Sequence, residues 1–295
     1  MKSNIKDFQT YLKEIKKCSD NTFDAYISDV EHFLKYCAEK GIEDPNEFKS
    51  KDISEYLDYI VSIGKSASTK TRITASLRCY FKYLYNNGFI SENCAQSIKN
   101  PRSVRSIPEV LTSNEVLSLL AQPSTTDFKG MRDKAMLELL YATGIKVTEL
   151  IELNLNDINL QIGILHIKSE HHERIVPIYQ TAVKHISEYI NIARPVLISD
   201  ANEKKLFSNY NGKPMSRQGF WKIIKYYSKK AGIDKDITPQ TVRHSFAAHL
   251  LENGAELVDI KDMLGHTDIS STQVYTQIVK SKYLQSYTKF HPLAK

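Results

Sequence analysis

Three separate stretches after residue 138 carry residue types that phosphate chemistry uses. Lys146 lies in the first, Arg243 in the second, and His266 and Tyr275 in the third. A guanidinium can offer two parallel hydrogen-bond donors to phosphate oxygens, and a tyrosine hydroxyl can act as a nucleophile. Residue type alone does not identify a catalytic residue, because the chain has 17 tyrosines and most must be packing or surface residues. The interpretation therefore depends on the sequence around each residue.

The surrounding sequence closely resembles the tyrosine recombinases, with its nearest likeness among Xer-type chromosome resolvases and related integrases. Four segments carry the resemblance: LLYATGIKVTELIEL (139–153), ITPQTVRHSFAAHLLENG (237–254), IKDMLGHTDISSTQVYTQI (260–278) and YTKFHP (287–292). The N-terminal segment SASTKTRITASLRCYFKYL is similar to the family's core-binding helix. Order and spacing agree over nearly the whole chain, which chance similarity does not produce.

The resemblance implies cleavage of a DNA strand through a 3′-phosphotyrosyl intermediate with release of a 5′-hydroxyl. Tyr275 matches the nucleophile, His266 the second histidine position, and Arg243 the second arginine. The family also uses a first arginine, a first histidine position and a β-hairpin lysine, which together stabilise charge and protonate the leaving oxygen. Neither a metal nor a cofactor is implied.

The first arginine of the family pattern ATGxRxxEL is replaced here. The sequence is ATGIKVTEL, so Lys146 stands at that position and Glu149 is retained three residues later. Lysine keeps the positive charge but lacks the planar fork that binds two phosphate oxygens at once. Losing such a transition-state contact typically costs about 3 kcal/mol.

The first histidine position is also changed, because PQTVRHS replaces the family's PHTLRHS and puts Gln240 there. Glutamine can hydrogen-bond an oxygen but does not titrate, so it cannot relay a proton. His244 follows Arg243 directly, and on a helix it should point about 100° away from it. We therefore do not expect His244 to act as a substitute.

The hairpin that carries the family's catalytic lysine departs as well. The turn is KSEHHER in place of a GKGNKER-like sequence, so Lys168 is the only nearby lysine. A shift by one residue in a strand reverses the face to which a side chain points. His171 or His172 could donate the proton instead, although adjacent histidines on a turn are more often simply solvated.

The pattern of apolar residues predicts a mainly α fold with a small antiparallel β-meander. Helices are expected over 19–40, 53–63, 68–85, 131–142 and 147–153, and the meander over 157–178. We predict a helical core-binding domain over 1–99, a linker over 100–111 and a catalytic-type domain over 112–295 that form a DNA clamp. Thr112 and Glu115 form a capping box at the start of the second domain.

Double-stranded DNA is the partner that the resemblance implies, and basic residues suit it. The candidate phosphate contacts lie on or beside the 68–85 helix and in the linker: Lys65, Lys70, Arg72, Arg78, Lys82, Arg102 and Arg105. Each of them taken singly is more often a solvated surface residue, but for the cluster in a helix that matches the family we expect DNA contact. The net charge of +6 suits a polyanion but also occurs in many proteins with no such partner.

The C-terminal tail from Ser281 resembles the segment that family members dock into a neighbouring protomer. Its Tyr283, Leu284 and Tyr287 would form the buried stripe. We expect a protein that is monomeric or weakly associated in solution and that assembles on DNA, with itself or with another recombinase.

Composition is ordinary for a globular protein, with 41% hydrophobic and 25% charged residues. The sequence has neither a membrane-spanning apolar stretch nor a signal-peptide core, which favours the cytoplasm. The four cysteines match no zinc spacing and are expected to be reduced packing residues.

Two hypotheses of different classes remain. The first is a sequence-specific DNA-binding protein whose strand cleavage is weak or lost through Lys146, Gln240 and the altered hairpin. The second is an active site-specific recombinase that cleaves DNA through Tyr275.

Overall fold

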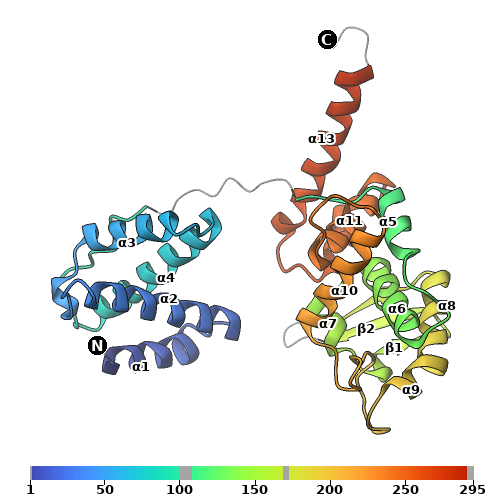
Figure 1. Cartoon of the computed structure of the whole chain (residues 1–295). Coiled ribbons are helices and arrows are strands. Elements are labelled where there is room, and N and C mark those ends of the chain that lie inside the picture. The colour runs from blue at the N-terminus through green and yellow to red at the C-terminus, as the bar shows by residue number, and fades with distance from the viewer. Residues whose placement is uncertain (1, 100–107, 169–172, 291–295) are drawn as a thin grey trace. The chain divides into compact units, whose positions relative to one another are not determined.

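A computed structural model describes residues 2–99, 108–168 and 173–290, and the chain divides into two compact units, Met1–Arg105 and Ser106–Lys295 (Figure 1). Most of the predicted linker, including Arg102 and Arg105, lies outside the described residues, as does the hairpin turn with His171 and His172.

The first unit is helical, as predicted. It contains α1 (Lys2–Thr10), a π-helical turn (Tyr11–Ile15), α2 (Asp20–Ala38), a 3-10 turn (Pro45–Glu47), α3 (Ser50–Ser62) and α4 (Ala67–Asn86). Phe33 of α2 lies at the centre of the core, where its ring contacts those of Phe48, Tyr56 and Phe81. The three- and four-residue spacing of apolar residues therefore placed the α2 and α4 stripes correctly.

The second unit mixes helices with one small sheet. Its helices are α5 (Ser113–Leu120), α6 (Phe128–Thr143), α7 (Val147–Glu152), α8 (Gln180–Glu188), α9 (Arg194–Leu197), α10 (Arg217–Lys230), α11 (Pro239–Glu252), α12 (Leu257–Leu264) and α13 (Gln273–Phe290). The strands β1 (Ile158–Asn159), β2 (Ile164–Lys168) and β3 (Glu173–Pro177) form an antiparallel sheet in the order β1-β2-β3, which confirms the predicted meander. The capping box of Thr112 and Glu115 is also present.

Helix α6 is central to the second unit because it packs against both α8 and α11. Its residues Met136, Leu139 and Leu140 are fully buried. A further cluster joins α11, α12 and α13 through Phe246, Leu264 and Tyr275. These packed helices fix the relative positions of the residues described below.

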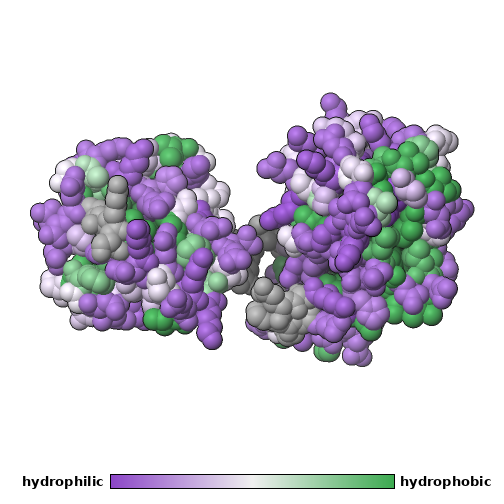
Figure 2. All heavy atoms as spheres, turned by 90° about the horizontal axis from the view of Figure 1, so that it is seen from below, coloured by the Kyte–Doolittle hydropathy of each residue, from purple (hydrophilic) through white to green (hydrophobic). Residues whose placement is uncertain are grey.

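The hydropathy of the surface and the state of the cysteines agree with what the composition led us to expect. Hydrophilic residues cover much of both units, and the second unit also shows a larger hydrophobic area (Figure 2). The four cysteines are free thiols, and Cys37 and Cys94 are buried packing residues as expected. Within the parts of the chain that the structure describes, no helix combines the length and apolarity that crossing a bilayer requires.

Candidate active site

Arg243 lies on α11 with a side chain that the protein covers almost completely, at 1% exposure. Its guanidinium donates to the carbonyl oxygen of Gly144 and, at 2.8 Å, to that of Leu264. The two carbonyl groups lie at the C-terminal ends of α6 and α12. The last carbonyls of a helix have no hydrogen-bond partner within that helix. Burial lowers the pKa of Arg243 to about 10, while Glu149 acts to raise it, so the side chain stays charged at neutral pH.

His266 is fixed from both sides of its ring. Its Nε2 lies 3.1 Å from the guanidinium nitrogen Nη2 of Arg243, and its Nδ1 lies 2.9 Å from Oγ1 of Thr272. Because arginine only donates, Nε2 of His266 accepts and the ring proton is on Nδ1. Burial and the charges of Arg243 and Lys146 lower the pKa of His266 to about 4, so the ring is neutral at physiological pH.

Tyr275 lies near the start of α13 and is 1% exposed. Its hydroxyl oxygen is 3.0 Å from Nδ1 of His244. Burial raises the pKa of Tyr275, while Arg243 acts to lower it. The structure thus places Tyr275, Arg243 and His266 in one region of the second unit, and their catalytic roles stay a prediction.

His244 contacts the hydroxyl of Tyr275, a contact that its position about 100° from Arg243 on the helix did not predict. His244 and Arg243 do leave α11 in different directions, but α13 packs against α11 and brings the hydroxyl of Tyr275 to His244. Gln240, one turn earlier on α11, places Nε2 3.2 Å from Nε2 of His244. The angle between His244 and Arg243 on α11 does not determine which residues of another helix His244 contacts.

Lys146 is exposed and lies at the N-terminal cap of α7, where its backbone N–H donates to Glu149 Oε2 at 2.7 Å. Its charge contributes to the lowered pKa of His266, which places it beside the site. Lys146 can therefore offer one ammonium group to a phosphate near His266, without a two-pronged contact.

Glu149 supports this region through a second arginine. Arg174 of β3 donates from Nη1 and Nη2 to the two carboxylate oxygens at 2.9 and 2.8 Å, and from Nε to the carbonyl of Met263 at 2.8 Å. Burial alone would raise the pKa of Glu149, but the hydrogen bonds from Arg174 hold it below its usual value. A Cβ at Gly265 would come within 2.7 Å of Arg174, so glycine permits this close packing. The contacts join α7, β3 and α12.

Lys168 is not brought into these contacts. It pairs across the hairpin with Glu173, whereas its neighbour Ile167 pairs with Arg174. Opposite residues in an antiparallel pair share a face and successive residues alternate, so Lys168 lies on the face away from the Arg174 side chain.

The sequence interpretation missed three residues of the cluster: His244, Thr272 and Arg174. The four-residue spacing from Gln240 was the available signal for His244, because such side chains are neighbours on a helix. Thr272 and Arg174 carried no comparable signal, since their partners come from other elements.

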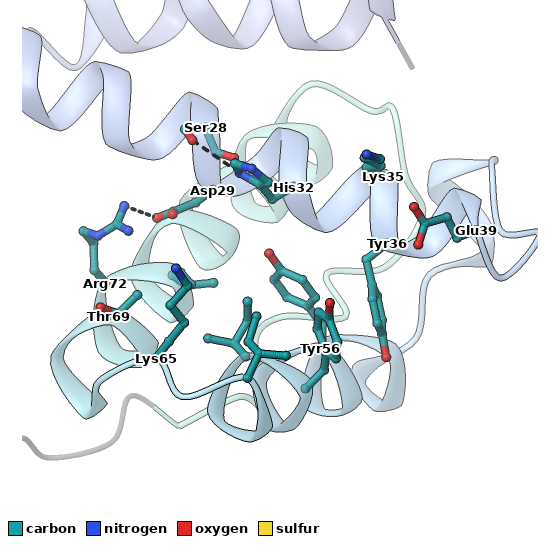
Figure 3. Close-up of a pocket in the computed structure, with 14 residues that line it drawn as sticks. Ser28, Asp29, His32, Lys35, Tyr36, Glu39, Tyr56, Lys65, Thr69 and Arg72 are labelled. Atoms are coloured by element: carbon teal, nitrogen blue, oxygen red, sulfur yellow. Dashed lines mark hydrogen bonds and ion pairs between the residues drawn. The ribbon is translucent and has the colours of Figure 1, made fainter.

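In the first unit, Lys65, Thr69 and Arg72 line a pocket of about 350 Å³ together with residues of α2 and α3 (Figure 3). Arg72 donates to Asp29 at 2.7 Å, and this buried carboxylate also accepts from Ser76 at 2.9 Å. The guanidinium of Arg72 is therefore held in place and its charge is partly compensated.

The other basic residues of the first unit that could contact DNA differ in whether an acidic side chain pairs with them. Lys70 pairs with Asp58 at 3.1 Å. Arg78 and Lys82 are exposed and line another groove with Lys16. Six residues on a helix turn the direction by about 120°, so Arg72 and Arg78 point to different sides of α4. The predicted basic cluster thus divides between two faces.

Comparison with known proteins agrees with these motifs. The pattern described as "Phage integrase family" matches residues 109–282, and "Phage integrase, N-terminal SAM-like domain" matches residues 5–88. Tyrosine recombinase XerD of Listeria monocytogenes (serotype 4b, strain F2365) is 41% identical over 297 residues, and that of Staphylococcus epidermidis (strain RP62A) is 39% identical over 295 residues. Each comparison covers 100% of both chains.

Among solved structures, XerH recombinase bound to palindromic difH substrate matches with a TM-score of 0.76 at 18% identity, covering 98% of this chain and 84% of that one. XerA recombinase matches with a TM-score of 0.55 at 25% identity, covering 98% and 99%. The shared motifs, the two family matches and the full-length relatives agree that the chain belongs to the phage integrase family of tyrosine recombinases and resembles its Xer-type members.

Proposed function

We propose that this protein binds a specific double-stranded DNA site and that its strand cleavage through Tyr275 is weak or lost. The proposal rests above all on the hydrogen bonds of Arg243. The guanidinium is covered and uses its donors on two main-chain carbonyls and on His266. In the free chain, few of these donors are available to a phosphate.

The neighbouring positions do not replace what Arg243 lacks. Lys146 offers a point charge instead of a fork, and Gln240 does not titrate. Lys168 lies on the hairpin face away from Arg174. Transition-state stabilisation by fixed donors is usually the largest single contribution to such a reaction, so these changes together favour slow cleavage.

A second candidate function is an active recombinase, and one observation favours it. The hydroxyl of Tyr275 is held by His244 within a connected set of side chains. In this reaction, Tyr275 Oη would release its proton to solvent and form a bond to phosphorus while the bond to the 5′-oxygen breaks, and that oxygen would take up a proton from solvent. Because the hydroxyl is buried, cleavage would require α13 to shift when DNA binds.

DNA as the partner is supported by proteins of the same fold that were solved in complexes. XerH recombinase is bound to its difH substrate, and the Tn1549 transposon integrase is in complex with circular intermediate DNA. We extend this class of partner to the present chain. We propose further that two copies, or one copy and another recombinase, assemble on neighbouring half-sites.

A nicked duplex with a Xer-type site, analysed on native and denaturing gels, tests both candidates. The native gel comes first, because without a bound complex the absence of cleavage has no meaning. A bound complex with little or no adduct supports the first candidate. A fast-forming, denaturation-resistant adduct that disappears in Tyr275→Phe contradicts it and supports the second. A chain that binds no DNA duplex would contradict both.

A further inference from the structure

The hydroxyl of Tyr275 is contacted by an imidazole that an amide holds in turn. Nδ1 of His244 lies 3.0 Å from Oη of Tyr275, and the two ring centroids are 5.6 Å apart. On the other side of the ring, Nε2 of Gln240 lies 3.2 Å from Nε2 of His244. Gln240 and His244 are one turn apart on α11, so rigid helical geometry holds the pair together.

The chemistry of these groups gives each hydrogen bond a direction. An amide nitrogen only donates, so Nε2 of His244 accepts from Gln240. A neutral imidazole carries one proton, which is then on Nδ1 and is donated to the Tyr275 oxygen. Gln240 therefore donates a hydrogen bond to His244, and His244 donates one to the Tyr275 oxygen that would attack phosphorus.

The surroundings keep this imidazole neutral. Burial and the adjacent charge of Arg243 lower the pKa of His244 to about 4. The other titratable groups near it are Tyr275 of α13 and His266 after α12, and Lys146 of α7 acts on His266. A ring with so low a pKa is a weak base, so we do not assign His244 the role of general base. It can hold the hydroxyl in one orientation.

We propose that His244 and Gln240 are positioning residues for Tyr275, with Gln240 setting the tautomer of His244 so that its Nδ1–H is directed at the phenolic oxygen. A donor at this oxygen favours negative charge on it, which strengthens a nucleophile. The glutamine then has a role of its own at a position where the family pattern has histidine. The inference rests on the proposed function only in taking Tyr275 as the nucleophile.

Nitrogen NMR of the free protein tests the tautomer without DNA. In ¹⁵N-histidine-labelled protein, two-bond proton–nitrogen correlations report which nitrogen of each neutral ring carries the proton. The chain has nine histidines, and His244→Asn identifies the signals of His244 by their loss. We expect the Nδ1–H tautomer in the wild type. Gln240→Glu offers only acceptors and should convert His244 to the Nε2–H tautomer. A wild-type ring protonated on Nε2, or a ring that Gln240→Glu leaves unchanged, would overturn the proposal.

The rate of adduct formation tests whether the tautomer matters for chemistry. At saturating protein on the nicked duplex, Gln240→Glu should slow single-turnover adduct formation about tenfold, the effect expected from reversing one hydrogen bond. Gln161→Glu, in the exposed turn between β1 and β2, is the matched control and should leave both tautomer and rate unchanged.

If the wild type forms no measurable adduct, the same comparison is made in the Lys146→Arg background. A converted tautomer with an unchanged rate would overturn the positioning role. Failure of the proposed function appears separately, as loss of DNA binding on the native gel or as fast cleavage by the wild type.

Discussion

The arginine that this site retains uses its hydrogen bonds on the protein itself. Arg243 closes the C-terminal ends of α6 and α12 and holds His266 in one tautomer. Such contacts stabilise a buried charge, since an unpaired one would be costly. They also leave fewer of the five guanidinium N–H donors for a phosphate. Lys146, whose charge acts on His266, could add donors, but it has only the point charge of an ammonium group.

Replacing Lys146 by arginine, whose guanidinium offers two parallel donors, should therefore accelerate cleavage. We expect Lys146→Arg to raise the single-turnover rate of adduct formation on a nicked duplex by roughly tenfold or more, because a second bidentate contact stabilises charge in the transition state. Lys184→Arg on α8, whose side chain is 70% exposed, is the control for the substitution itself. An equal rate in wild type and Lys146→Arg would argue against weakened chemistry at this position.

The two neutral histidines make stability depend on pH. Burial and Arg243 lower the pKa of His244 and His266 from 6.5 to about 4. Between these values the unfolded chain binds more protons than the folded one, so stability falls as the pH falls from about 6.5 towards 4. We expect a loss of about 1–2 kcal/mol per histidine between pH 7 and pH 5, measured by urea unfolding.

Removing both histidines tests whether they cause this pH dependence. The double variant His244→Asn/His266→Asn should lose less stability over the same range, whereas His185→Asn on α8 should behave as the wild type. If the double variant shows the full wild-type slope, these two rings are not its source.

At the scale of elements, periodicity predicted α2, α3, α4 and the meander because each of them buries one face. The stripe around Phe33 and Phe81 and the alternation over β2 and β3 are local patterns. The contacts that build the site are not local. Arg174 meets Glu149 from 25 residues away, and His244 meets Tyr275 from 31 residues away. Motif matching located Arg243, His266 and Tyr275, but partners of this kind depend on how the helices pack.

The link between Glu149 and Arg174 should be important for the second unit. Side-chain exposures are 12% and 10%, so Glu149→Gln would leave a nearly buried guanidinium without its countercharge. We expect the free energy of unfolding to fall by about 2–4 kcal/mol, measured by urea denaturation. Glu55→Gln, which breaks an exposed pair with Lys40, should change it little. A similarly small effect for Glu149→Gln would show that the pair is not needed.

The two faces of α4 should differ in their contribution to DNA binding. Arg72 already pairs with Asp29, whereas Arg78 and Lys82 form no ion pair among the residues that the structure describes. We expect Arg78→Ala/Lys82→Ala to reduce the salt dependence of binding by about 2 in the log–log slope, as expected for two lost phosphate contacts. Lys65→Ala/Arg72→Ala should reduce it less, because pairing already compensates part of that charge. Equal reductions from both double variants would contradict the distinction.

At the scale of the whole molecule, one helix joins the site to the C-terminus. Helix α13 begins with the buried residues Tyr275, Ile278 and Val279. Its later turns extend beyond the packed helices of the second unit (Figure 1). A continuous helix transmits displacement along its axis, so a contact made by its far end could bias the position of the Tyr275 hydroxyl. Assembly and chemistry would then be coupled through α13.

A chain ending after Lys280 separates these roles, because it keeps the buried first turns of α13 and removes the rest. We expect unchanged thermal stability and unchanged affinity for a single half-site, but a loss of cooperativity on DNA with two half-sites, measured by titration on native gels. Exchanging Lys295 for alanine in the full chain controls for alteration of the terminus. If the shortened chain binds two half-sites with wild-type cooperativity, the far end of α13 does not dock into a neighbouring copy. If cooperativity is lost and the remaining single-site complexes also form adduct at a changed rate, the same helix couples assembly to the position of Tyr275.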